Sequence, residues 1–168
     1  WLGLAGMLAA GAAGAETYYV APGGSDVPGT PGTEWTTALA SISNAVVSYA
    51  KLAGDVVLVT NDTYNLTQEV LVSAGITVKS FNDDPAATIL DCGGNARAFQ
   101  INHADALVAG FTVTNATAES GGGVRVISGT VSNCIVTGCR ASQGGGIYIT
   151  QGSVLDSRVI GNFATNYG

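Results

Sequence analysis

A block near the end of this 168-residue chain is written twice, and the duplication leaves few folds open to it. Residues 121–126 (GGGVRV) return as residues 144–149 (GGGIYI), and residues 129–134 (GTVSNC) return as residues 152–157 (GSVLDS). Both second copies begin 23 residues after the first. A fixed period of this length through matched blocks is typical of a solenoid, in which each repeat forms one turn.

The repeats predict turns made of strands. Val124 and Val126 in one copy, and Ile147 and Ile149 in the other, alternate with polar residues between glycines, which is the period-two pattern of a strand. A helical solenoid would need apolar residues at i, i+3, i+4 and i+7, and each glycine of a triplet would cost it about 1 kcal/mol relative to alanine. We therefore expect a coil of β-strands.

Positions 23 residues apart keep their character, which predicts how the coils stack. Val131 aligns with Val154, Val136 with Val159, Gly138 with Gly161 and Ala141 with Ala164, and Val108 and Val113 extend the register one coil earlier. Stacked coils place such positions about 4.8 Å apart, with like side chains in contact. The residues that mark this structural repeat are Gly121, Gly122, Gly123, Val131, Cys134, Gly144, Gly145, Gly146 and Val154.

These motifs resemble a known family. The GGGIYI, GTVSNC/GSVLDS and GCRA/GNFA elements are similar to those of secreted right-handed parallel β-helix proteins of the pectin-lyase-like class, and most of all to polymorphic outer-membrane-protein and related cell-surface repeats. The resemblance runs from about residue 17 to the end. It implies an all-β solenoid, a right-handed parallel β-helix of about five coils, and an exported or cell-surface protein, but it says little about activity.

Composition narrows the possible partners. Twelve Asp and Glu against six Lys and Arg give a net charge of −6, and a lysine-poor acidic chain lacks the clustered cations that nucleic-acid binding requires. The 24 glycines and the 11% content of charged residues suit stacked strands with tight corners. Cys92, Cys134 and Cys139 are an odd set without a CxxC motif, so we interpret them as small buried residues.

The first 15 residues resemble a secretory signal. WLGLAGMLAAGAAGA is apolar throughout and ends in Ala13-Gly14-Ala15, an A-x-A-like cleavage site before Glu16. The stretch is shorter than the ~20 residues of a membrane span. We expect residues 1–15 to be a partial signal peptide, so that the exported chain starts near Glu16, and the alternative is an apolar buried helix.

Residues 16–54 are predicted to close the N-terminal end of the solenoid, and residues 55–168 to form the coils. A short strand and a proline-rich loop lead into a helix predicted over residues 37–52, with Leu39, Ile42, Val46 and Tyr49 on one face and Gly54 as its stop. Such a helix would cover unpaired strand edges. Because the chain ends where another glycine-rich start is due, we expect the β-helix to be truncated at its C-terminus.

Two polar clusters could carry chemistry. Arg97, His103 and Asp105 lie around one coil corner, and an arginine with carboxylates is what a polysaccharide lyase would need, often with Ca²⁺. Lyase sites, however, use several carboxylates on successive coils, whereas no acidic residue here stacks on another at the 23-residue period. We therefore interpret the cluster as a solvated corner and predict no catalytic residue.

The second cluster consists of acidic turn residues. Asp62, Asp83, Asp84 and Asp91 offer oxygen ligands for a hard cation, but their spacing matches no EF-hand loop, so we predict no metal site. Sequons occur at Asn61, Asn65 and Asn115, which would matter only in a glycosylating pathway.

Two functions remain open. The first is a non-catalytic, adhesin-like or carbohydrate-contacting protein that needs no cofactor and binds a polysaccharide or a host or cell-surface glycan. The second is a polysaccharide lyase or glycoside hydrolase whose active site lies outside this sequence, and only this alternative would use Ca²⁺. In either case nucleic acid is not an expected partner, and any membrane attachment would lie in sequence beyond residue 168.

Overall fold

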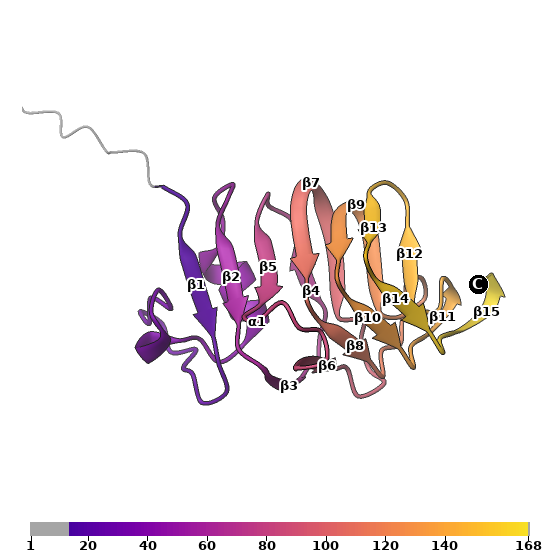
Figure 1. Cartoon of the computed structure of the whole chain (residues 1–168), viewed down its shortest axis with the longest axis horizontal. Helices are drawn as coiled ribbons and strands as arrows, with labels where there is room; N and C mark the ends of the chain where they lie inside the picture. Colours follow the sequence, from indigo (N-terminus) through magenta and orange to yellow (C-terminus); the bar gives the residue numbers. More distant parts are fainter. Residues whose placement is uncertain (1–13, 168) are drawn as a thin grey trace, which may run out of the picture.

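The computed structural model describes residues 14–167, and they form a parallel β-solenoid of about five turns. Their fifteen strands are wound into coils that succeed one another along the long axis from the N-terminal to the C-terminal end (Figure 1). Every strand pairing is parallel. The coil of strands predicted from the repeat, and the right-handed parallel β-helix implied by the resemblance, are confirmed.

Three sheets make up the sides of the coil. The first runs in the order β1 (Thr17–Val20), β2 (Val56–Val59), β5 (Thr77–Ser80), β7 (Phe99–Ala109), β9 (Val124–Ser132) and β12 (Ile147–Ile149), with β4 (Val70–Val72) beside β7 and β13 (Ser153–Leu155) beside β9. The second contains β3 (Asp62–Asn65), β6 (Thr88–Asp91), β8 (Thr112–Thr114), β10 (Ile135–Thr137) and β14 (Arg158–Ile160). The third pairs β11 (Arg140–Gln143) with β15 (Phe163–Tyr167).

The register is the one that the 23-residue period predicts. Val108 pairs with Val131 and Val131 with Val154 in the first sheet, while Val136 pairs with Val159 in the second. Alternation along each strand turns these valines inward and their neighbours outward. Val131 and Val136 are fully buried, and Phe99 and Phe111 fill the centre with their ring centroids 5.7 Å apart.

The glycine triplets are corners where successive coils touch through their backbones. A Cβ atom added at Gly122 would collide with the carbonyl oxygen of Gly145 and lie 2.5 Å from that of Arg140. A Cβ atom at Gly145 would strike the backbone of Phe163 in the next coil. Because no side chain fits between these backbones, glycine is required for the coils to approach at this corner.

The N-terminal helix is shorter than predicted. Instead of one helix over residues 37–52, the chain forms a 3₁₀ turn, η1 (Trp35–Thr37), and then a helix made of α1 (Ile42–Asn44) and a π-helical segment, η2 (Ala45–Tyr49). Leu39 is fully buried, but it is extended and forms a parallel bridge with Val20 of β1. Leu39 was predicted on the buried face of the helix because it lies three residues before Ile42. It is buried, but it does not belong to the helix.

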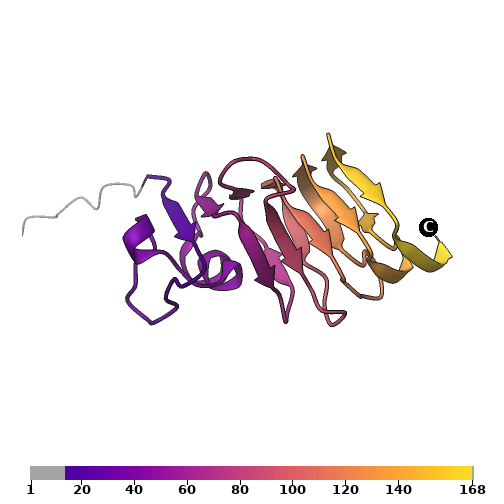
Figure 2. The same ribbon diagram turned by 60° about the horizontal axis from the view of Figure 1, so that its bottom comes forward.

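The open edge of β1 is covered by the loop, not by the helix. The amide of Tyr19 donates to the carbonyl of Gly32 at 2.6 Å. The amide of Leu39 donates to the carbonyl of Tyr19 at 2.8 Å, and the amide of Ala21 donates to the carbonyl of Leu39 at 3.0 Å. The helix lies at the N-terminal end of the stack (Figure 2) and contacts β1 and β4 with Ile42, Ala45 and Val46 buried. Residues 14–54 thus close this end with two layers.

Candidate functional site

Outward-facing residues of three consecutive coils line up beside the glycine corners. Gln100 of β7 pairs in register with Arg125 of β9, and Arg125 pairs with Tyr148 of β12. Val124 and Val126, on either side of Arg125, are buried. The period of the strand therefore holds the arginine and the tyrosine on the outer surface, one above the other.

Arg97 ties this row to the neighbouring coils. Its Nε atom lies 2.7 Å from Oε2 of Glu69 in the preceding coil, and its Nη1 donates to the carbonyl oxygen of Ser120 at 2.7 Å in the following one. The Arg97 side chain is only 14% exposed, against 39% for Glu69. The guanidinium is thus fixed in position by both contacts.

Three hollows join into one polar surface along the coils. A hollow of about 390 Å³ lies between Glu119, Arg125 and Tyr148, and one of about 470 Å³ lies between Glu69, Arg97 and the same Glu119. A third, of about 410 Å³, is lined by Arg140 and shares Thr117 with the second. We call this surface the arginine groove and define it by Glu69, Arg97, Glu119, Arg125, Arg140 and Tyr148.

Arginines converge in this groove although the protein is acidic. Three of the four arginines of the chain line it, together with three carboxylates, those of Glu69, Asp91 and Glu119, whereas the net charge of the whole chain is −6. Arg97 is paired with Glu69, and Arg140 lies over the ring of Phe163, 5.5 Å from its centroid. The buried Nε of Arg125 has no hydrogen-bond partner among the described residues. Arg125 is therefore the arginine of the groove that has neither an ion pair nor an aromatic partner among the described residues, although its Nε is closed to solvent.

The hydroxyl and amide groups around Arg125 allow the groove to bind neutral polar groups as well as anions. Ser120, Ser142, Gln143 and Asn166 line the same hollow as Tyr148. Each of these side chains both donates and accepts hydrogen bonds, as sugar hydroxyls do. Together with a guanidinium, which matches a carboxylate in two parallel hydrogen bonds, the set suits a hydroxyl-rich anion.

The structure places the predicted polar cluster at two separate corners. His103 and Asp105 lie together between the two halves of β7, where the amide of Asp105 donates to Nδ1 of His103 at 3.2 Å and both face Gly75. Arg97 precedes β7, and its carboxylate partner is Glu69. The arginine groove therefore contains Arg97 but not His103 or Asp105.

The acidic turn residues serve the corners. The Asp91 carboxylate accepts hydrogen bonds from the amide of Gly93 at 2.9 Å and from Nδ2 of Asn115 at 3.1 Å, so the side chain of that sequon is engaged. The carboxylate of Asp84 accepts from the amide of Ala86 at 2.9 Å. Within residues 14–167, no group of three or more His, Cys, Asp or Glu side chains is placed to hold a metal ion.

The three cysteines are free thiols buried in the coil. Burial, reinforced by the nearby Cys139 and Asp91, raises the pKa of Cys92 to about 12. Burial likewise raises the pKa of Cys134 to about 11, although backbone amides around it act in the opposite direction. Thiols with such pKa values are protonated at neutral pH and poorly nucleophilic, which fits a packing role.

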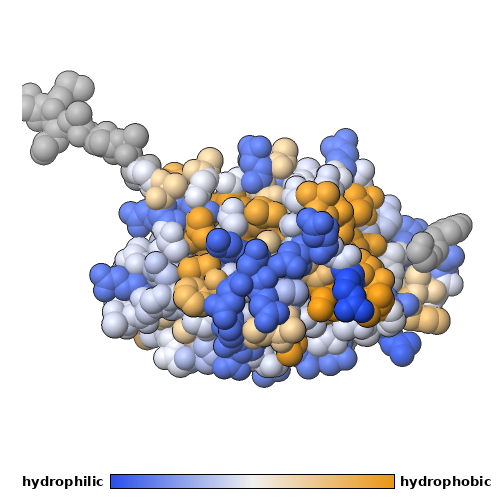
Figure 3. All heavy atoms as spheres, viewed as in Figure 1, coloured by the Kyte–Doolittle hydropathy of each residue, from blue (hydrophilic) through white to orange (hydrophobic). Residues whose placement is uncertain are grey.

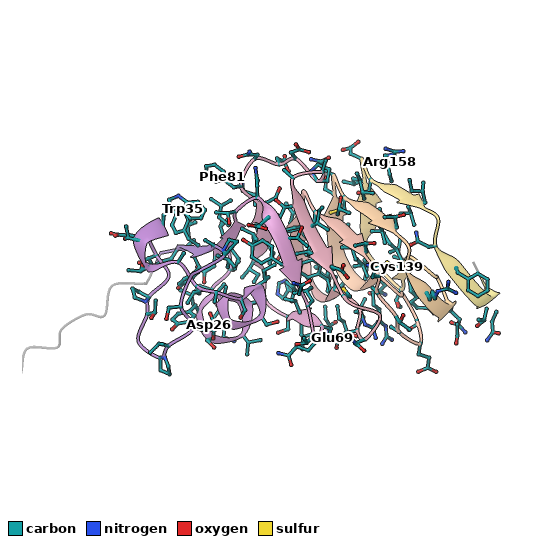
Figure 4. The ribbon with its side chains drawn as sticks, turned by 90° about the horizontal axis from the view of Figure 1, so that it is seen from below. Asp26, Trp35, Glu69, Phe81, Cys139 and Arg158 are labelled. Carbon is teal, nitrogen blue, oxygen red and sulfur yellow. The ribbon has the colours of Figure 1, made fainter. Side chains whose placement is uncertain are left out.

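A second exposed feature is a run of aromatic rings near the N-terminal end. The rings of Tyr19 and Trp35 have centroids 4.3 Å apart, and those of Trp35 and Phe81 are 5.4 Å apart and edge to face. Trp35 and Phe81 are 41% and 54% exposed. Figure 4 shows them on the edge of the molecule opposite Glu69, so they are separate from the arginine groove.

Arg125, Tyr148 and Glu119 were not identified as site residues from the sequence. The available signal was the period itself, since Arg125 and Tyr148, and likewise Arg97 and Ser120, are 23 residues apart. These residues belong to no recognisable sequence motif. The hollow between them also requires the glycine corner beside Tyr148, which only the structure shows.

Comparisons of the chain with protein-family models, with curated proteins and with solved structures give no match. Within residues 14–167 the structure has no helix long and apolar enough to cross a membrane.

Proposed function

We propose that this protein is an exported, non-catalytic β-helix that contacts an anionic polysaccharide along the arginine groove. The single observation that carries the proposal is the position of Arg125, which forms no ion pair within the described residues and lines a hollow together with hydroxyl and amide side chains. Export is supported by the signal-like sequence of residues 1–15. Of that stretch, residues 1–13 lie outside the described part of the chain.

The shape of the groove favours an extended ligand. Its hollows follow one another across neighbouring coils and are open on one side, which suits a polymer of sugars laid along the surface. A carboxylate on the polymer would accept two hydrogen bonds from the Nη groups of Arg125, because its Nε is buried, and the Tyr148 ring and the amides would contact the neighbouring hydroxyls. The ordered Arg97 and Glu69 pair would hold the edge of the groove in place.

Binding of polygalacturonate and alginate by calorimetry tests the proposal, with neutral dextran as the uncharged comparison. We expect Arg125→Ala and Tyr148→Ala each to weaken binding of the acidic polymers roughly five- to tenfold, or about 1 to 1.4 kcal/mol. Arg158→Ala is the matched control, because it removes the same charge from the second sheet, on the edge opposite Glu69 (Figure 4).

Two results would contradict the proposal. Equal losses in Arg125→Ala and Arg158→Ala would mean that only the overall charge matters, and the groove would have no special role. Release of unsaturated uronates from the acidic polymers in the presence of Ca²⁺, detected by ultraviolet absorbance, would favour the lyase instead.

A further inference from the structure

Asp55 is a buried carboxylate at the junction of the N-terminal segment and the first coil. It is 1% exposed, and both of its oxygens accept hydrogen bonds from backbone amides. Oδ1 lies 2.9 Å from the amide nitrogen of Glu16, and Oδ2 lies 3.0 and 2.9 Å from those of Lys51 and Leu52. Asp55 thus joins the start of β1 to the end of the helical segment.

This carboxylate has hydrogen bonds but no cation. Within residues 14–167 the one ion pair joins Arg97 to Glu69, and the Lys51 side chain is exposed to solvent although its amide binds Asp55. A buried carboxylate without a countercharge is costly, because the three neutral donors replace only part of its hydration. A positive charge at one of the three donor positions would offset this cost.

One of the three donors lies at the proposed processing point. Gly14, Ala15 and Glu16 are exposed, and β1 begins at Thr17, so the Ala15–Glu16 bond lies just outside the fold. The carbonyl of Glu16 is already held in the first sheet, where it accepts from the amide of Val56 at 2.8 Å. The nitrogen and carbonyl oxygen of Glu16 are thus both fixed, whereas the bond before it is accessible to a peptidase.

We propose that Asp55 is the receptor for the new N-terminus of the processed chain. Hydrolysis of the Ala15–Glu16 bond consumes one water, leaves a carboxylate on Ala15, and frees the nitrogen of Glu16 as an amine that takes up a proton. The resulting α-ammonium occupies the place of the Glu16 amide and forms an ion pair with Asp55. The inference rests on the export part of the proposed function and is independent of the arginine groove.

Removal of residues 1–15 should then stabilise the folded chain that remains. Before cleavage Asp55 receives a neutral donor from Glu16, and afterwards it receives a charged one, which forms a hydrogen bond about twice as strong. The pair would be buried on the carboxylate side, so solvent would screen it less than a surface ion pair. The unprocessed chain keeps an uncompensated charge at the same place.

The test is a cycle of four proteins unfolded by urea at pH 6, where an α-amine of ordinary pKa near 8 is charged. Residues 16–168 with a free amine are compared with residues 15–168, in which the Glu16 nitrogen is again an amide, each with and without Asp55→Asn. We expect the extra residue to lower the folding equilibrium constant roughly five- to tenfold with Asp55 present and less than twofold with Asp55→Asn. Equal effects in the two backgrounds would overturn the inference.

A second measurement covers the case in which Asp55→Asn does not fold. The α-amine of residues 16–168 should react with an acetylating ester at least tenfold more slowly than the α-amine of residues 15–168, with the exposed Lys51 as the internal reference. Equal rates would overturn the inference. N-terminal sequencing of the exported protein separates the two proposals, because retained residues 1–15 would refute processing without affecting either measurement of Asp55.

Discussion

At the scale of single residues, the corners of the coil use positive φ angles in two settings. Gly138 (φ 65°) follows β10, and its counterpart after β8 in the preceding coil is Asn115 (φ 53°). Gly110 (φ 77°) follows β7, and its counterpart after β9 is Asn133 (φ 46°). Asparagine tolerates this backbone, so conformation alone would allow it at either glycine.

The two glycines differ in the space available for a side chain, so the same substitution should have different costs in stability at the two positions. A Cβ atom at Gly138 would lie 3.4 Å from Oγ1 of Thr114, an ordinary contact, so Gly138→Asn should cost less than about 1 kcal/mol. A Cβ atom at Gly110 would collide with Oγ of the buried Ser80 and lie 3.3 Å from Cα of Asp83, so Gly110→Asn should cost about 2 to 3 kcal/mol. Urea unfolding measures both, and equal losses would show that φ alone controls these corners.

At the scale of elements, hydrophobic periodicity predicted the buried face of the N-terminal helix but not the residue at which the helix begins. Ile42 and Val46 were predicted on its buried face and are buried in the structure. Its start could not be predicted, because the amides of Ala40 and Ser41 are held by the carboxylate of Asp26, 14 and 15 residues earlier. This bond fixes the chain just before Ser41, whose side chain caps α1 by accepting from the amide of Asn44.

The Asp26 contact makes the helical segment sensitive to acid. Partial burial opposes ionisation of Asp26, but hydrogen bonds from Ser41, Asn44 and the Ala40 amide prevail and lower its pKa. A carboxyl whose pKa is lowered by folding stabilises the protein above its ordinary pKa near 3.9, and the contribution is lost as the pH falls through the lowered value.

We therefore expect Asp26→Asn to reduce the free energy of unfolding by about 0.5 to 1 kcal/mol at pH 7, a modest loss because the side chain is exposed. The loss should shrink toward pH 3. Urea unfolding at pH 7, 5 and 3 measures it, and Glu34→Gln in the same loop is the control. A loss that does not change with pH would show that the carboxylate charge is irrelevant.

At the scale of the whole molecule, the repeat predicted the register but not the surface. The inward row from Val108 through Val131 to Val154 follows from a period visible in the sequence. The arginine groove is built from residues of four coils. Some of them, such as Glu69 and Arg97, are not 23 residues apart, because the corners between them differ in length. The earliest coils carry no glycine triplet, so their alignment with the later ones could not be deduced from the period.

The C-terminal end of the stack leads to the last prediction. β12, β13, β14 and β15 each have a strand partner on one side only among the described residues, and Ile149, Val159 and Phe163 are 47%, 45% and 53% exposed. Ile149 and Val159 pair with Val126 and Val136, which are fully buried one coil earlier. Hydrophobic side chains are also visible over β13 and β14 in Figure 3. This end therefore offers both an apolar surface and unpaired backbone groups.

Because open strand edges pair with other chains, we expect the 168-residue chain to self-associate as its concentration rises from micromolar toward millimolar. Sedimentation velocity measures the association. Replacing both residues in Ile149→Lys/Val159→Lys should suppress it, because charges that point inward at an edge oppose pairing. Leu71→Lys, on the outer face of β4 and 40% exposed, is the matched control and should still associate. If the unmodified chain stays monomeric throughout, the open coil is not adhesive and the edge argument fails.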